Sequence, residues 1–202
     1  MTSGIMPLIV VGLLVLVPLL WVIGTFNGLI RLRNQCRESW AGIDTELKRR
    51  YDLIPRLVEV VKGYAQYERD VLERVVAARA AAVASTGSPA SQAKDETQLV
   101  GALRTFFGVV ERYPDLKANQ NFLALQEELV NTEDRIAAAR RFYNANVRDF
   151  NTRTQVFPAN LIAGAFGFVA AEFFEVDDHT IRAAPAVNLA PPSISPTTDK
   201  SA

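Results

Sequence analysis

The residues able to do acid–base or metal chemistry are few and scattered in this sequence. The only histidine is His179 and the only cysteine is Cys36. A metal site needs several converging ligands, and the Glu-x-x-His pairs of di-iron helical bundles are missing. Glu127, Glu128 and Glu133 are the carboxylates on which such a site would be built. We therefore expect no enzyme, no catalytic residues, no cofactor and no metal; a carboxylate-metal helical-bundle enzyme is the less favoured alternative.

A second group of polar residues recurs at helical spacing within an apolar stripe. Gln126, Glu133 and Arg140 lie seven residues apart in the third predicted cytoplasmic helix. Such side chains either lie at the edge of the stripe and reach into water, or form buried polar layers that fix helix register. In the second case we expect Glu68 and Arg79 as their partners.

Aromatic residues are the candidates for interaction contacts. Trp40 lies in the apolar seam of the first cytoplasmic helix. The segment 159–175 carries phenylalanines on a Gly/Ala background: Phe166, Phe168, Phe173 and Phe174. This segment either packs as a short helix on the end of the bundle, which we favour, or contacts the membrane or another chain, because exposed Phe clusters mark binding surfaces.

An apolar run precedes all of these residues. From Pro7 to Phe26 every residue is apolar or small, and about 20 such residues span a bilayer as a helix. No Lys or Arg precedes the run, whereas Arg31, Arg33 and Arg37 follow it. Basic flanks stay in the cytoplasm. We expect an uncleaved single-pass anchor in the cell membrane, with the amino end outside and the carboxy-terminal domain cytoplasmic.

The soluble part reads as long helices. From Trp40 onward apolar residues alternate at spacings of four and three, which is typical of a helix packed along another helix. We expect this first cytoplasmic helix to run to about Ala84, a second from about Asp95 to Tyr113, and a third from about Asp115 to Phe157. The first seam is longer than the second helix can cover, which leaves Trp40 to Leu47 for another chain.

These elements divide the chain into four parts. Residues 1–6 form a short extracytoplasmic end, 7–26 the transmembrane anchor, 27–176 a cytoplasmic helical bundle, and 177–202 a disordered tail rich in Pro, Ser and Thr. The predicted fold class is all-α: a single amino-terminal transmembrane helix followed by a bundle of long antiparallel helices with a short carboxy-terminal helix.

Composition narrows the choice of partners. Lys+Arg and Asp+Glu both number 22, and this balance argues against nucleic acid, which needs a basic excess. The sequence has no Gly-rich phosphate loop after a strand and no Gly-x-Ser-x-Gly, so no small-molecule substrate is evident. Cys36 is read as an apolar-leaning helix position, with acylation or redox activity as the alternatives.

Several long strings resemble the LemA family of bacterial membrane proteins. They are SWAGIDTELKRRYDLIPRLVEVVKGYAQYE at 39–68 and YPDLKANQNFLALQEELVNTEDRIAAARRFYNANVRDFN at 113–151, followed by FP at 157–158, FGF at 166–168 and FFE at 173–175. The resemblance covers most of residues 27–175. It implies a single amino-terminal membrane helix and a cytoplasmic domain of long antiparallel helices, with no established catalytic residues. Some relatives are associated with membrane organisation.

Together these features predict a membrane-anchored, non-enzymatic helical scaffold or interaction protein at the cytoplasmic face. We expect residues 7–26 to contact the lipid bilayer and the bundle to self-associate as a homo-oligomer or to bind a protein partner. A signalling adaptor is the main alternative.

Overall fold

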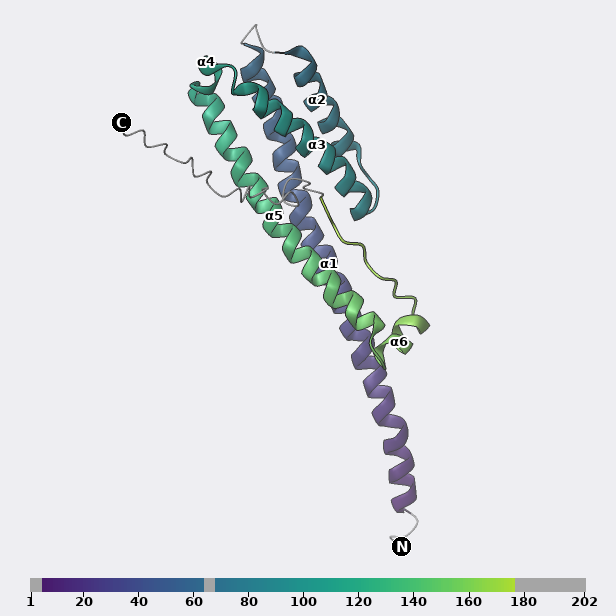
Figure 1. Cartoon of the computed structure of the whole chain (residues 1–202). Coiled ribbons are helices and arrows are strands. Elements are labelled where there is room, and N and C mark those ends of the chain that lie inside the picture. Colours follow the sequence, from purple (N-terminus) through teal and green to yellow (C-terminus); the bar gives the residue numbers. More distant parts are fainter. Residues whose placement is uncertain (1–4, 64–67, 177–202) are drawn as a thin grey trace, which may run out of the picture.

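The computed structural model describes residues 5–63 and 68–176, and within them it contains helices and no strand. The helices are α1 (Ile5–Lys62), α2 (Arg69–Ala84), α3 (Pro89–Val110), α4 (Pro114–Lys117), α5 (Gln120–Gln155) and α6 (Ala159–Ala165). The all-α fold class, with one long amino-terminal apolar helix and a short carboxy-terminal helix, is confirmed (Figure 1).

The first helix is the axis of the molecule. α1 has 58 residues and continues through Pro18 and Pro55. Its apolar side chains from Val10 to Ile23, except Val22, are exposed, and this part is long and apolar enough to cross a membrane. Beyond Leu29 the same helix is buried against α5 and the α2–α3 hairpin, whereas its amino-terminal part projects alone (Figure 1).

The expected first cytoplasmic helix is in fact two helices, so its predicted end at Ala84 is wrong. α1 ends at Lys62, Gly63 follows, and α2 runs back beside α1 from Arg69. A lysine in the last turn with glycine directly after it is a typical helix end. The apolar spacing continues in phase across this break, which is why the pattern predicted one helix.

Local capping sets the boundaries of the next helices. The Ser88 hydroxyl accepts from the Ser91 N–H at 3.4 Å, and Pro89 follows it, so α3 begins earlier than predicted. The Asn119 side-chain oxygen accepts from the N–H groups of Asn121 and Phe122, at 2.9 and 3.1 Å, and starts α5. The predicted third helix is thus the short α4 followed by α5.

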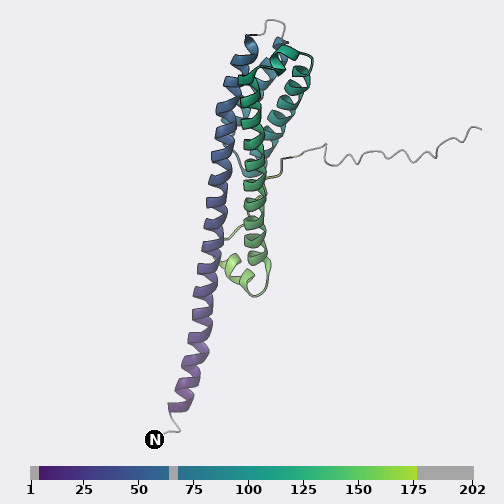
Figure 2. The ribbon, with the colours of Figure 1, turned by 90° about the vertical axis from the view of Figure 1, so that its left-hand side faces the viewer.

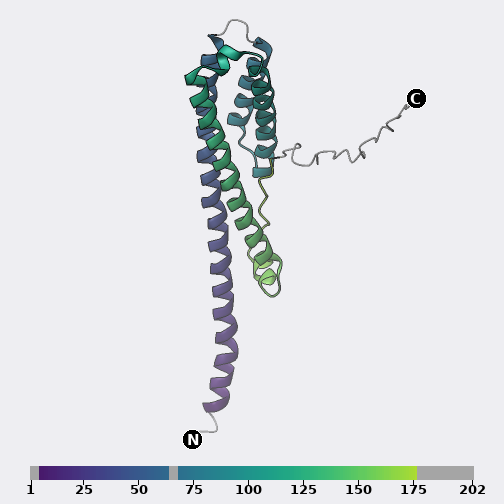
Figure 3. The ribbon, with the colours of Figure 1, turned by 60° about the vertical axis from the view of Figure 1, so that its left-hand side comes forward.

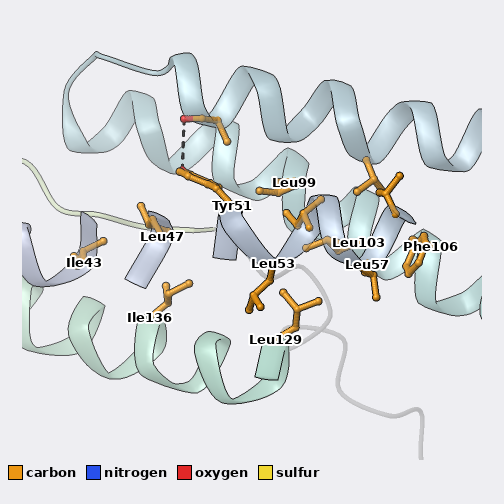
Figure 4. Packing of buried hydrophobic residues seen from close by; sticks show 14 of the residues in the cluster. Ile43, Leu47, Tyr51, Leu53, Leu57, Leu99, Leu103, Phe106, Leu129 and Ile136 are labelled. Atoms are coloured by element: carbon orange, nitrogen blue, oxygen red, sulfur yellow. Dashed lines mark hydrogen bonds between the residues drawn. The ribbon is translucent and has the colours of Figure 1, made fainter. Parts of the chain in front are cut away.

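The main partner of α1 is α5, which has 36 residues and lies along it in every view (Figures 2 and 3). Figure 4 shows α1 between α5, with Leu129 and Ile136, and α3. Ile43 and Leu47 are completely buried in this packing. The prediction that Trp40 to Leu47 await another chain is therefore wrong, because α5 is long enough to cover them.

The last described segment is extended, not helical. Gly167 has φ 68° and turns the chain after α6. Residues 168–176, here called the strap, then run back along α5 (Figure 1). Asn144 and Asn151 each exchange two hydrogen bonds with the strap backbone, at Phe174 and Ala171, over 2.8–3.1 Å. The predicted helix over 159–175 is confirmed only as far as Ala165.

Candidate functional site

A buried ion-pair cluster ties three helices together in the bundle. Arg50 of α1 and Glu96 of α3 are both fully buried, and their charged groups are in direct contact. The other terminal nitrogen of Arg50 donates to Oε2 of Glu133 on α5 at 2.7 Å. Because the guanidinium is a rigid planar fork, one side chain binds both neighbours of α1 at once.

The hydroxyl of Tyr51 completes this cluster. It donates to the second carboxylate oxygen of Glu96, so both oxygens of that buried carboxylate have partners. Burial raises the pKa of Glu96, while Arg50 and Tyr51 act in the opposite direction. Burial and the Glu96 carboxylate also raise the pKa of Tyr51, which keeps its hydroxyl protonated as a donor. Because Arg50 and Glu96 are fully buried and bonded to each other, the cluster holds α1 and α3 in register, and Glu133 at its half-exposed edge adds α5.

A second polar contact lies where proline interrupts the α1 hydrogen-bond ladder. Residue 55 is proline and has no N–H, so the carbonyl of Tyr51, four residues earlier, lacks its usual helical donor. Nε of Arg79 on α2 donates to this oxygen at 2.7 Å. The proline therefore creates an acceptor on α1 that α2 fills.

The polar residues predicted from spacing reach different partners from those expected. Glu133 pairs with Arg50, not with Glu68 or Arg79. Arg140 donates to the carbonyl of Val176 in the strap at 3.2 Å. Gln126 is half-buried on α5. Glu68 precedes α2 and pairs with Arg112 at 2.7 Å near the surface.

The aromatic residues divide into core and surface groups. Trp40 packs edge-on against Tyr143 and Phe174, with ring centroids 5.2 and 5.3 Å apart. Phe174 is fully buried and Trp40 half-buried, so neither is free to bind another chain. Phe173 lines an open hollow of about 830 Å³ between the strap and α3.

Phe166 and Phe168 lie at the other end of the bundle, against Phe26 of α1. Their ring centroids are 4.9 and 5.7 Å from that of Phe26. Phe166 is exposed, and Phe168 is half-buried beneath the guanidinium of Arg33, which lies 5.3 Å from the ring centre. These two aromatics therefore fasten the α6 region to α1.

The candidate metal ligands and the cysteine show no arrangement for catalysis within the described residues. Within residues 5–63 and 68–176 no three His, Cys, Asp or Glu residues are grouped to hold a metal ion. Glu128 faces Arg49 at 3.8 Å. Cys36 is buried, and burial together with the nearby Asp149 carboxylate raises its pKa, so the reactive thiolate is disfavoured. His179 lies outside the described residues.

Four residues that position these elements were missed from the sequence. Arg50 is a charged residue beside the apolar seam of α1, yet it is buried because α1 has partners on two sides. Glu96 lies three residues before Leu99 and so continues the apolar seam of α3 backward, a signal that was available. Asn144 and Asn151 are seven residues apart on α5, which places them on one helix face.

Comparison with known proteins decides the family. The sequence model described as the LemA family matches residues 39–189. The chain belongs to the LemA family. That range contains the Arg50–Glu96–Glu133 cluster, α6 and the strap, and it begins after the apolar run.

Named relatives agree with this assignment. The chain is 26% identical over 159 residues to Protein LemA of Metamycoplasma hominis, covering 77% of this chain and 71% of that protein. It is 23% identical over 175 residues to Magnetosome protein MamQ 2 of Paramagnetospirillum magneticum, covering 74% and 64%. It is 21% identical over 174 residues to Magnetosome protein MamQ of Magnetospirillum gryphiswaldense, again covering 74% and 64%. The chain thus spans less than two thirds of the length of the MamQ relatives.

The first prediction concerns the cation of the buried cluster in this LemA-family chain. Arg50→Met leaves the Glu96 carboxylate buried without its counter-charge and should lower the free energy of unfolding by about 3–5 kcal/mol. Without Arg50, burial and the Glu133 carboxylate still raise the pKa of Glu96, and only the Tyr51 hydrogen bond acts in the opposite direction. A raised folded-state pKa gives stability that is present below the ordinary glutamate value of about 4.3 and is lost as the pH rises through the folded value. The deficit of the variant should therefore grow from acid to neutral pH.

The measurement is unfolding of the full chain in detergent, followed by helical circular dichroism over a pH series. Arg49→Met is the matched control, because the adjacent Arg49 is about half exposed with its partner at 3.8 Å; its loss should stay under about 1 kcal/mol. Equal losses for the two variants, or a deficit in Arg50→Met that shrinks toward neutral pH, would contradict the cluster described above.

The second prediction concerns the carbonyl that Pro55 leaves without a helical donor. Arg79→Met removes the Nε donor that bonds to this carbonyl at 2.7 Å and should lower the free energy of unfolding by about 1–3 kcal/mol. In a Pro55→Ala background the backbone N–H of residue 55 can bond to the Tyr51 carbonyl, so the same arginine substitution should cost less. A double-mutant cycle on unfolding free energies measures the difference. No coupling between the two positions would show that Arg79 stabilises α2 in another way.

Proposed function

We propose that this LemA-family chain is a membrane-anchored, non-enzymatic helical scaffold at the cytoplasmic face of the cell membrane. It would present its bundle to a second copy of itself or to a protein partner, and so take part in organising the membrane. Its similarity to proteins named magnetosome proteins supports that role.

The observation that carries the proposal is the continuity of α1. One helix of 58 residues contains both the exposed apolar stretch and the buried axis of the bundle. A flexible linker would leave the position of the bundle relative to its membrane span variable, whereas a continuous helix fixes both the distance and the orientation of the bundle. A bundle joined in this way to a membrane span is held at a set place above the bilayer.

The charge pattern supports the orientation. Arg31 and Arg37 are exposed just beyond the apolar stretch, and Arg33 is half-buried. Basic residues flanking a span favour the cytoplasmic side. The described bundle, which follows these arginines, is therefore proposed to lie in the cytoplasm.

The polar chemistry of the bundle favours a scaffold over an enzyme. Its buried carboxylate, Glu96, is bonded to Arg50 and Tyr51 from neighbouring positions of α1. Cys36 is buried with a raised pKa. These groups stabilise the packing of helices and are not positioned at an opening where a substrate could bind.

Labelling with a membrane-impermeant maleimide tests the topology. Cys36→Ser removes the native thiol, and Gln98→Cys adds one at an exposed position of α3. We expect Gln98→Cys to be labelled only after the cells are permeabilised, because the bundle lies inside. Fractionation of the same cells at alkaline pH should leave the chain in the membrane pellet. Labelling in intact cells, or release of the intact chain by alkali, would overturn the proposed location.

Cross-linking tests self-association. Leu123 and Val130 are exposed apolar residues seven positions apart on α5, so they share one face. Two copies anchored in one membrane with the same orientation must be related by an axis close to the membrane normal, which brings like residues together. In membranes, Cys36→Ser with Val130→Cys should form bis-maleimide dimers in good yield, and Cys36→Ser with Gln98→Cys should not. Equal yields would indicate random collision, and no dimer would remove a second copy as the partner on this face.

A further inference from the structure

The α5–α6 turn, α6 and the chain just after it form an apolar projection at one end of the bundle. We call residues 156–169 the foot. Ile162 and Ala163 of the foot are buried against Leu29 of α1, and Val22 and Phe26 pack around this contact. In all three ribbon views α6 lies beside α1 at the level where the bundle ends, and only α1 extends further (Figures 1, 2 and 3).

The outer side of the foot is apolar and open. Phe157 is 78% exposed, in a chain whose bundle core is otherwise well covered. Val169 is 80% exposed but lies on the bundle side of the foot, where it borders a hollow with Arg33 and Cys36. Leu161 and Phe166 are also more than half exposed. Exposed aromatic and aliphatic side chains gathered in this way mark a surface that another apolar phase covers.

The foot carries no charge at all. Between Arg153 and Glu172 the sequence contains no Asp, Glu, Lys or Arg, and within the foot Asn160 is the only residue with a side-chain amide. A surface segment facing water usually carries charged residues, whereas a segment lying at the headgroup and acyl boundary does not need them. The sequence of the foot therefore fits lipid better than water.

The position of the foot along α1 indicates that the apolar phase covering it is the lipid bilayer. The exposed apolar surface of α1 extends from Val10 to Ile23, except for the half-buried Val22. The foot packs against α1 between Val22 and Leu29, and its Phe168 also lies under Arg33. The packing from Val22 to Leu29 spans eight residues, about 10 Å of helix. A bilayer core of about 30 Å is filled by about 20 helical residues, so this interval falls at the interfacial layer where the span ends.

Arginines border the foot on the side of the bundle. Arg31 lies two residues past Leu29, and Arg153 lies in the last turn of α5; both are exposed. Cationic side chains at this depth reach the phosphate groups of the lipids and favour anionic headgroups.

We propose that the foot is a second membrane contact, in which residues 156–169 insert into the interfacial layer of the same bilayer that α1 crosses. The inference rests on the proposed function, because it requires α1 to be the span. The continuity of the apolar surface from α1 to the foot, the absence of charge and the bordering arginines favour lipid over a second copy of the chain. With the foot inserted, the bundle contacts the membrane at two points instead of one.

The experiment compares three exposed leucines replaced by cysteine in a Cys36→Ser chain. Leu14→Cys lies in the span, Leu161→Cys in the foot and Leu123→Cys at the distal end of α5; the leucines are 69%, 60% and 46% exposed. Each full-length variant receives a nitroxide label and is reconstituted in vesicles of phosphatidylcholine and phosphatidylglycerol. Collision with oxygen, which concentrates in lipid, is then compared with collision with a water-soluble nickel chelate.

We expect the labels at positions 14 and 161 to collide with oxygen several-fold more, relative to nickel, than the label at 123. If position 161 behaves like 123 while 14 reports lipid, the foot proposal is overturned and the span stands. If position 14 also reports water, the proposed membrane anchor fails as well. If position 161 is shielded from both reagents, protein covers the foot, and a second copy replaces lipid as its occupant.

Discussion

The continuity of α1 as one helix, through Pro18 and Pro55, is the constraint on which the other elements depend. It joins an exposed apolar stretch to the buried axis of the bundle, and every later element packs against it or against a helix that does. α5 covers one side along its length, the α2–α3 hairpin covers another side at the distal end, and α6 packs where the bundle stops. Because α1 has partners on two sides, it buries a wide face that includes Arg50.

Apolar contacts alone do not fix how far each neighbouring helix is shifted along the wide buried face of α1, because apolar side chains tolerate such shifts. Three sets of polar contacts fix this register. The Arg50 cluster fixes α3 and α5 against α1, and Arg79 fixes α2 through the carbonyl that Pro55 exposes. Along α5, Asn144 and Asn151 fix the strap. Each contact matches specific atoms, so a shift by one turn would leave buried polar groups unpaired.

Much of this fold follows from local rules that can be read in the sequence. The apolar run before Asn27, the four-and-three spacing beyond Trp40 and the stop at Pro158 predicted the long helices and their class. The end of α1 was missed because the apolar spacing stays in phase across Gly63, so a periodic signal outweighed a correct stop signal. The strap was missed because its order comes from side chains of α5, and the Gly/Ala background of 159–175 predicts a helix.

The candidate cluster was harder to predict, since its members matter through tertiary contacts. Glu133 was singled out from its heptad position, but its partner Arg50 was not, because a charged residue beside an apolar seam is usually solvated. The burial of Arg50 beside the seam can be predicted only once the topology shows that α1 has neighbours on two sides. Glu96 could have been found by extending the α3 seam backward from Leu99, where a charged residue occupies an apolar position.

The stiffness of α1 also sets a length. With the apolar stretch in the bilayer and the helix upright, the end of α1 at Lys62 stands about 50 Å above the membrane surface, at a rise of about 1.5 Å per residue. A partner bound near this end of α1 would be held at this distance from the membrane, which is several times the Debye length at physiological salt. In the proposed scaffold role, α1 would set the height of the bundle above the membrane, and shortening or lengthening α1 by whole turns would change that height in steps of about 5.4 Å.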